Sequence, residues 1–197
     1  DPLGNIYQVD SPLLNLQTRS GNGVDVQFQY QTELSDFFAV PGYGASLDLR
    51  VVATFHESDA TVLLQGNAPI ECAGRLGGSC SANFIRATPG QRTLYSARWA
   101  SGPASVSTRV HQIGKMIAAD DAYANNALPV DAQFYWDLSG NYALNEKIDL
   151  FGGVNNVLND APPVIGYRAG GDSNTQVQLY DTVGRRYFVG ATYHFGQ

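Results

Sequence analysis

The segment 131–144, DAQFYWDLSGNYAL, alternates apolar and polar side chains with a period of two residues. The apolar set comprises Ala132, Phe134, Trp136, Leu138, Tyr142 and Leu144, and the polar set between them comprises Gln133, Asp137, Ser139 and Asn141. Successive side chains of a β-strand point to opposite faces, whereas one face of a helix repeats about every 3.6 residues. The segment is therefore predicted to be a strand with one apolar and one polar face.

The same alternation recurs elsewhere in the chain. Residues 23–31 set Val24, Val26, Phe28 and Tyr30 against Asp25, Gln27, Gln29 and Gln31, and residues 44–57 set Leu47, Leu49, Val51, Ala53 and Phe55 against polar neighbours. Weaker patterns mark 91–101, 104–114 and 147–154, and a last strand falls within 184–197. No stretch of the sequence keeps a helical apolar stripe for three turns, so the fold class is all-β, with about seven or eight strands.

Strand length and composition favour a membrane setting for this sheet. Several runs reach the roughly 9 to 11 residues with which a tilted strand crosses a bilayer, beyond the 5 or 6 common in soluble proteins. Charged residues make up 15% of the chain, against about 25% in soluble domains. The net charge of −6 excludes the basic surface that a nucleic-acid partner requires.

The connections between predicted strands alternate in length. Shorter ones span 35–44, 101–104 and 145–147, and longer ones span 57–90, 115–130 and 155–184. In an antiparallel up-and-down sheet this alternation gathers all long loops at one end, as in outer-membrane barrels with short periplasmic turns and long extracellular loops. We therefore expect residues 1–197 to form one domain, part of a transmembrane β-barrel with a periplasmic carboxyl terminus. The alternative from pattern alone is a soluble, carbohydrate-binding β-sandwich.

Motifs in the last third of the chain resemble the carboxyl-terminal end of a TonB-dependent outer-membrane receptor. They are an aromatic-Asp-Leu-Ser pattern at 136–139, the stretch GVNNVLND at 153–160 followed by Pro162 and Pro163, and YD at 180–181 with GRRYFVG at 184–190. The resemblance covers about a third of the chain, and its motifs are specific in combination.

The resemblance implies a function and partners for the whole protein. Receptors of this family carry an amino-terminal plug and a barrel of twenty-two strands, so this chain would lack the plug and the earlier strands. The family implies uptake of a scarce nutrient, such as a siderophore, cobalamin or glycan, driven by an inner-membrane TonB energy complex that acts through the plug. A small passive outer-membrane barrel or pore is the alternative.

The final strand also resembles an assembly signal. Barrels of this kind end on a pattern of glycine and two alternating aromatics, which here is Gly190, Tyr193 and Phe195. The barrel-assembly machinery would pair this strand with its own open edge, because strand addition draws affinity from main-chain hydrogen bonds. The alternative is that the aromatics only form the lower membrane girdle.

Two cysteines, Cys72 and Cys80, flank a glycine-containing stretch, and their even number favours a disulfide in an outer loop over two free thiols. The three histidines, His56, His111 and His194, are far apart in sequence, so we expect no metal site from them. No serine stands in a recognisable setting beside a base, and nothing indicates an enzyme or a cofactor.

Ligand contacts in a receptor fall on the long loops and on the outer part of the polar face. The charged and aromatic residues there are Arg75, Asp120, Asp121, Tyr123, Arg168 and Asp172. They are the candidates for contacting a small-molecule ligand, and the sequence does not name that ligand.

Overall fold

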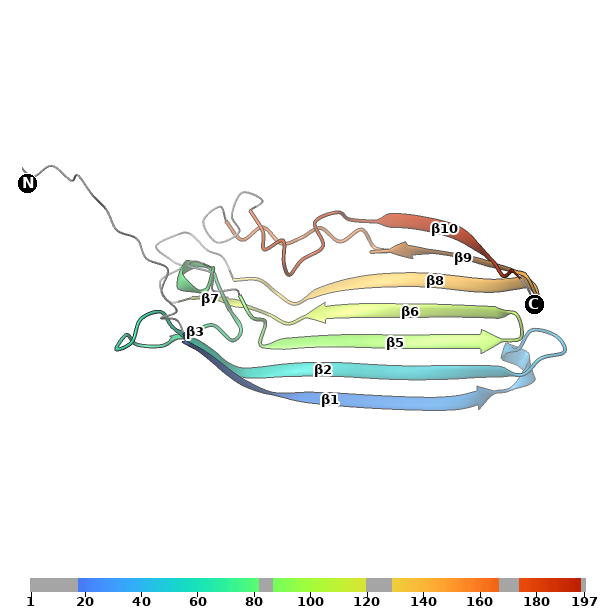
Figure 1. Ribbon diagram of the computed structural model, residues 1–197, viewed down its shortest axis with the longest axis horizontal. Coiled ribbons are helices and arrows are strands. Elements are labelled where there is room, and N and C mark those ends of the chain that lie inside the picture. The colour runs from blue at the N-terminus through green and yellow to red at the C-terminus, as the bar shows by residue number, and fades with distance from the viewer. Residues whose placement is uncertain (1–17, 82–86, 120–128, 167–173, 196–197) are drawn as a thin grey trace, which may run out of the picture.

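The computed structural model describes residues 18–81, 87–119, 129–166 and 174–195. Within these ranges one large sheet runs in the order β1-β2-β5-β6-β8-β9-β10, and every neighbouring pair is antiparallel (Figure 1). Its strands are β1 (Thr18–Leu34), β2 (Ala45–Val62), β5 (Gln91–Ser101), β6 (Ala104–Ile113), β8 (Gln133–Asn145), β9 (Ile148–Asn155) and β10 (Arg186–Tyr193). The predicted all-β, up-and-down arrangement is confirmed.

Smaller elements lie between the long strands. A short strand, β3 (Ile70–Glu71), pairs with β2, while β4 (Arg75–Leu76) and β7 (Ile117–Ala118) form a separate parallel pair. Two 3-10 helices, η1 (Asp36–Phe38) and η2 (Gly78–Ser81), lie in the connections that follow β1 and β4. The sequence patterns predicted none of these short elements, because two to four residues are too few to display a period.

The first two strands are longer than the sequence predicted. The first begins at Thr18, not at 23, because a β-bulge between Asn22 and Gly23 shifts the register and breaks the alternation there. A Cβ atom at residue 23 would lie 2.3 Å from the carbonyl oxygen of Phe55, so the bulge requires a glycine. The second strand continues to Val62, where a long loop from 57 was expected.

Register places the apolar sets of all seven strands on one face of the sheet. Cross-strand pairs on this face include Val24–Phe55, Leu47–Trp99, Tyr95–Val110, Val110–Trp136, Tyr142–Leu150, Val154–Tyr187 and Ile148–Tyr193. The predicted sharing of one face by Phe134, Trp136, Tyr142, Tyr187 and Tyr193 is confirmed. Many of these side chains are exposed, with Phe28 at 58% and Tyr187 at 72%.

The opposite face carries the polar sets. Cross-strand pairs there include Gln29–Arg50, Asp48–Arg98, Ser96–Arg109, Arg109–Asp137, Ser105–Asn141 and Asp149–Thr192. Hydrogen bonds join some of them, such as Gln29 Nε2 to Asp48 Oδ2 at 3.0 Å. Two phenylalanines, Phe188 and Phe151, also lie on this face. Each packs its ring over the glycine opposite it on the neighbouring strand, Gly153 and Gly190 respectively.

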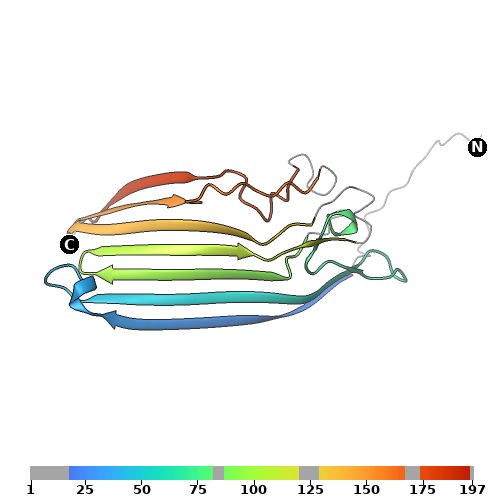
Figure 2. The ribbon, with the colours of Figure 1, turned by 180° about the vertical axis from the view of Figure 1, so that it is seen from behind.

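Long and short connections lie at opposite ends of the sheet, as predicted. Figures 1 and 2 show the turns after β1, β5 and β8 at one end and the described parts of the long connections at the other. The backbone N–H of His194 donates to the carbonyl of Lys147 at 2.9 Å, which places the end of β10 beside the short turn between β8 and β9.

The buried core lies at the long-connection end rather than on a face of the sheet. Its members are Cys72, Leu76, Cys80, Ala87, Ile113, Met116, Ala118, Ala119, Val130, Tyr135, Ile165 and Tyr180. Most of them belong to the connections that follow β2, β6 and β9. These connections therefore fold together, although sequence patterns treated them as loops.

The sheet is open within the part of the chain that the structure describes. Strands β1 and β10 end the strand order and do not pair with each other. The expected barrel is therefore present only as an open antiparallel sheet. No helix among the described residues is long and apolar enough to cross a membrane.

Candidate ligand-binding site

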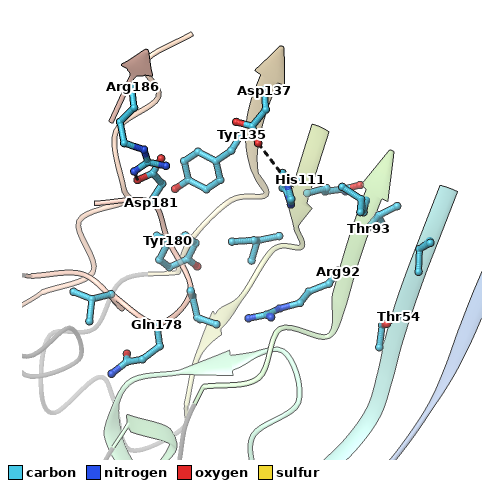
Figure 3. Close-up of a pocket in the computed structure, with 16 residues that line it drawn as sticks. Thr54, Arg92, Thr93, His111, Tyr135, Asp137, Gln178, Tyr180, Asp181 and Arg186 are labelled. Atoms are coloured by element: carbon cyan, nitrogen blue, oxygen red, sulfur yellow. Dashed lines mark hydrogen bonds and ion pairs between the residues drawn. The ribbon is translucent and has the colours of Figure 1, made fainter. Parts of the chain in front are cut away.

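A cavity of about 570 Å³ opens where the polar face of the sheet meets the connection between β9 and β10. This volume lies within the roughly 300 to 1,000 Å³ typical of small-molecule sites. Figure 3 shows His111, Tyr135 and Asp137 beside the cavity on their strands, with Tyr180 and Asp181 facing them from the connection. The remaining lining residues are Val52, Thr54, Arg92, Thr93, Leu94, Gln112, Ile113, Val177, Gln178, Leu179 and Arg186.

A turn in the connection forms the cover of this cavity. The backbone N–H groups of Leu179 and Tyr180 donate to the carbonyl of Gln176 at 2.9 and 3.1 Å. The turn buries Tyr180, which is 3% exposed, and its hydroxyl lies 3.7 Å from the Met116 sulfur. Burial, and to a lesser extent the nearby Tyr135, raises the pKa of Tyr180 to about 12, although the positive charge of Arg92 acts in the opposite direction. Its phenol therefore stays neutral at physiological pH.

Two carboxylates that line the cavity each have a basic neighbour. Arg186 donates to Asp181 at 3.1 Å, and the His111 ring lies 3.4 Å from an Asp137 oxygen. Partial burial opposes ionisation of Asp181, but the N–H groups of Val183 and Gly184 and the Arg186 guanidinium outweigh it, so the pKa of this carboxyl is lowered. The other oxygen of Asp137 accepts the backbone N–H of Asn156 at 2.9 Å.

Two further side chains of the lining lack such partners. The Arg92 guanidinium makes no hydrogen bond or ion pair with any residue in the described ranges, and its electrostatic effect reaches Tyr180. The Tyr135 side chain is buried, with 7% of the residue exposed, and its hydroxyl has no hydrogen-bond partner among the same residues. Such groups are where an incoming polar ligand gains most.

The stretch 153–160 holds the end of β9 in place beneath this site. The Asn156 side chain, in a residue that is 1% exposed, accepts the N–H of Asp160 at 2.8 Å and donates to its carbonyl at 2.9 Å. Asn156 has a φ of 52°, a left-handed conformation that asparagine tolerates better than most residues. The motif behind the family resemblance therefore has a local structural role in closing this turn.

Polar contacts fasten the connection after β2 to the sheet, and a disulfide closes a ring within that connection. Glu71 accepts the backbone N–H groups of Asp59 and Ala73 at 2.7 and 2.9 Å and the Ser58 hydroxyl at 2.5 Å. Arg19 donates to Asp59 at 2.6 Å. The expected disulfide between Cys72 and Cys80 is present, and both cysteines are buried.

Of the predicted ligand-contact residues, only one lies in the described ranges. Arg75 is in β4, where it lines a separate cavity of about 360 Å³ together with Glu71 and Cys80. The structure does not bring it to the large cavity. The predicted residues Asp120, Asp121, Tyr123, Arg168 and Asp172 lie outside the described residues.

The three histidines stay apart and each has its own neighbour. His56 Nδ1 is 2.9 Å from the Pro89 carbonyl, and His194 Nε2 is 2.8 Å from an Asp149 oxygen. His111 faces Asp137. Across the described ranges, no group of three His, Cys, Asp or Glu residues could hold a metal ion.

The proposed assembly-signal residues cluster at the end of β10. The rings of Tyr193 and Phe195 meet edge to face with centroids 4.7 Å apart, and Phe195 is 87% exposed. A Cβ at Gly190 would lie 2.3 Å from the Phe151 ring, so this glycine also has a packing role that the sequence analysis did not identify. The signal itself stays a prediction.

Sequence reasoning missed the residues that form the large cavity. Arg92 has the polar parity of its strand, but so does Arg98 in the same strand, and the sequence does not distinguish an arginine that lines a cavity from one that does not. Tyr135 lies at a polar position of the alternation in its strand, and an aromatic residue at such a position was the one feature of the sequence that could have indicated a site. Tyr180 was noted only as part of a motif.

No protein-family model, no curated protein and no solved structure matches this chain.

Proposed function

We propose that this chain is the carboxyl-terminal part of a TonB-dependent outer-membrane receptor, and that the whole protein takes up a scarce nutrient of the siderophore, cobalamin or glycan class. One observation carries the proposal: a continuous apolar face runs across seven strands and is exposed within the described residues. Soluble monomers rarely expose contiguous apolar surfaces beyond a few hundred Å². A membrane barrel turns such a face to lipid.

The dimensions of the apolar face support a membrane setting. In β1 the apolar parity runs from Val24 to Thr32, and in β2 its partners run from Phe55 to Leu47. Eight residue steps span about 27 Å along a strand, and a tilt of about 40° reduces this to about 21 Å across the membrane. That height is close to the apolar band of about 25 Å on outer-membrane barrels.

The open edges support a larger barrel rather than a small closed one. The outer edges of β1 and β10 leave backbone N–H and C=O groups without partners among the described residues. In hydrocarbon each such group costs several kcal/mol, so an open sheet cannot remain in a bilayer. Further strands, contributed by sequence before Asp1, would close the barrel, and a plug there would couple it to the TonB energy complex.

Fluorescence quenching tests the membrane part of the proposal. The only two tryptophans, Trp99 and Trp136, both lie on the apolar face. In the full-length protein, with any other tryptophan replaced by phenylalanine and the protein reconstituted into vesicles of brominated phospholipids, we expect both to be quenched strongly, while aqueous iodide quenches them little. Quenching by iodide alone would contradict lipid exposure and favour a soluble sandwich.

A matched pair of variants sharpens this test. Phe28 and Gln29 are adjacent in β1 and point to opposite faces. In a background with Trp99→Phe and Trp136→Phe, a tryptophan at 28 should respond to brominated lipid and a tryptophan at 29 to iodide. Equal responses from the two positions would refute the assignment of faces.

The gene sequence tests the transport part. We expect the region encoding residues before Asp1 to specify a plug-like domain and further alternating strands. A signal peptide directly before Asp1 would instead favour the small passive barrel.

A further inference from the structure

Among the described residues, the lining of the large cavity includes one cation, Arg92, without an acidic partner. Arg92 is on β5, between Thr54 of β2 and Ile113 of β6 in the register. Figure 3 shows its side chain extending into the cavity toward the segment that carries Gln178 and Tyr180. The other two basic groups of the lining face carboxylates, whereas the Arg92 guanidinium has no ion pair within the described part of the chain. Its planar donor fork is therefore free to meet an anion from solution.

A second unpaired group faces the same space from another strand. The Tyr135 hydroxyl is buried and points toward Asp181 (Figure 3), whose backbone is its polar neighbour, but no described residue makes a hydrogen bond of good geometry with it, which is rare for a polar atom inside a protein. Tyr135 is on β8, two strands from Arg92 and two residues further along in register, so their backbones lie about 12 Å apart across the sheet. A ligand that reaches both side chains is therefore the size of a small organic molecule rather than an inorganic ion.

Apolar side chains line the cavity beside these two polar groups, and Ile113 of β6 lies on the strand between theirs. Val52, Leu94, Ile113 and Leu179 line the cavity from β2, β5, β6 and the covering turn. They favour a ligand whose central part is flat or cyclic and apolar, because burying such surface is the main favourable contribution to binding.

The acidic residues of the lining limit the charge of the ligand. Asp137 and Asp181 border the same cavity, and the Asp181 carboxyl has a lowered pKa and stays ionised. Each of these carboxylates already faces a basic group, so Arg92 is the one cation of the described lining left to meet a ligand, and one guanidinium neutralises a single carboxylate but not a dianion such as a phosphate monoester. A carboxylate also matches the two parallel N–H groups of arginine.

We propose that this cavity binds a small organic monocarboxylate, with its carboxylate on Arg92, its apolar ring against Leu94 and Ile113, and a hydrogen-bond acceptor at its far end on the Tyr135 hydroxyl. This proposal rests on the proposed function in one respect: in a receptor barrel this end of the polar face would open to the cell exterior, which is the side from which the ligand would arrive. It names the chemical class that the receptor would take.

Two probes of the same shape test the assignment. 6-Hydroxy-2-naphthoate carries a carboxylate and a distant hydroxyl, and 6-hydroxy-2-naphthamide differs from it only by lacking the charge. With the full-length protein in detergent, calorimetry should show that the naphthoate binds at least about tenfold more tightly than the amide, as for a charge-assisted hydrogen bond. Equal affinities for the two probes, or no binding of either at millimolar concentration, would overturn the proposal.

Three variants assign the contacts. Arg92→Gln should weaken naphthoate binding by about ten- to a hundredfold, and Tyr135→Phe by about three- to tenfold, because the latter removes a single neutral hydrogen bond. Arg98→Gln is the control, since Arg98 is an exposed cation on the same strand and face but does not line the cavity. It should leave binding unchanged, and a loss equal to that of Arg92→Gln would refute the site.

The ligand-binding proposal and the membrane proposal can be refuted independently of each other. Calorimetry needs neither a bilayer nor an energy source, and the tryptophan quenching described above needs no ligand. Naphthoate binding without quenching by brominated lipid would keep the site and reject the receptor. Quenching without selective naphthoate binding would keep the membrane assignment and reject the carboxylate site.

Discussion

The disulfide between Cys72 and Cys80 offers the sharpest test of how the long-connection end is held together. Both cysteines are fully buried in the core that the connections form. Two backbone hydrogen bonds there report on the same unit: Gly74 donates to the Thr88 carbonyl at 2.7 Å and Ala119 to the Leu76 carbonyl at 2.9 Å. The perturbation is the double variant Cys72→Ala with Cys80→Ala.

The magnitude follows from the length of the closed ring. The two cysteines are 8 residues apart in sequence, and closing a loop of that length lowers the entropy of the open state by an amount worth about 2.5 kcal/mol at 25 °C. A change of about 1.4 kcal/mol is a factor of ten in an equilibrium constant, so local opening should become roughly 60-fold more frequent. Truncating two buried side chains adds to this loss, which makes the figure a lower limit.

Native-state hydrogen exchange measures this local opening. We expect the protection of the Gly74 and Ala119 amides to fall by at least that factor in the double variant. Amides in the middle of β6, such as that of Thr108, should keep their protection, because the long strands do not depend on the disulfide. Unchanged protection at Gly74 and Ala119 would show that the disulfide does not hold the connections, and the reasoning would be wrong.

Two further predictions concern pH and assembly. The pKa of Glu71 is lowered, because hydrogen bonds from Ser58 and from backbone N–H groups outweigh its partial burial; its stabilising contribution is therefore present above its unfolded pKa and is lost as the pH falls below about 4.5. Near-UV circular dichroism melts should show Glu71→Gln destabilised at pH 7, with a deficit that shrinks as the pH falls from 4.5 to 3, and an equal deficit at pH 7 and pH 3 would contradict this. If the last strand is an assembly signal, Phe195→Ala in the full-length protein should lower its outer-membrane level while Tyr142→Ala should not, and equal levels of both variants and the parent would leave only the girdle role.

Strand positions and face assignment could be predicted from the sequence because both depend on local order. Alternation of apolar and polar residues gave β5 its observed bounds and assigned the residues of β8 to their faces. A side chain's face depends only on whether its position is odd or even along the strand. The bulge at Gly23 shows where this approach fails. The bulge shifts the alternation by one residue, so the sequence pattern does not reveal that the strand continues back to Thr18.

The alternating lengths of the connections were equally readable, since they are counted directly along the chain. Their folding was not, because the core of the long-connection end joins Cys72, Met116, Val130 and Tyr180 from three separate connections. No period relates such residues, and only the ends of the sheet strands bring them together.

The sequence by itself therefore determined an all-β chain with a polar and an apolar face, and with its long loops at one end. Only the tertiary structure decided that Arg92, Tyr135 and Tyr180 line one cavity. These residues are far apart in the sequence, and they come together because β5 and β8 both pair with β6 and because a turn of the last connection folds back over the sheet. A strand pattern records which way a side chain points, while a binding site depends on which distant side chains point at the same space.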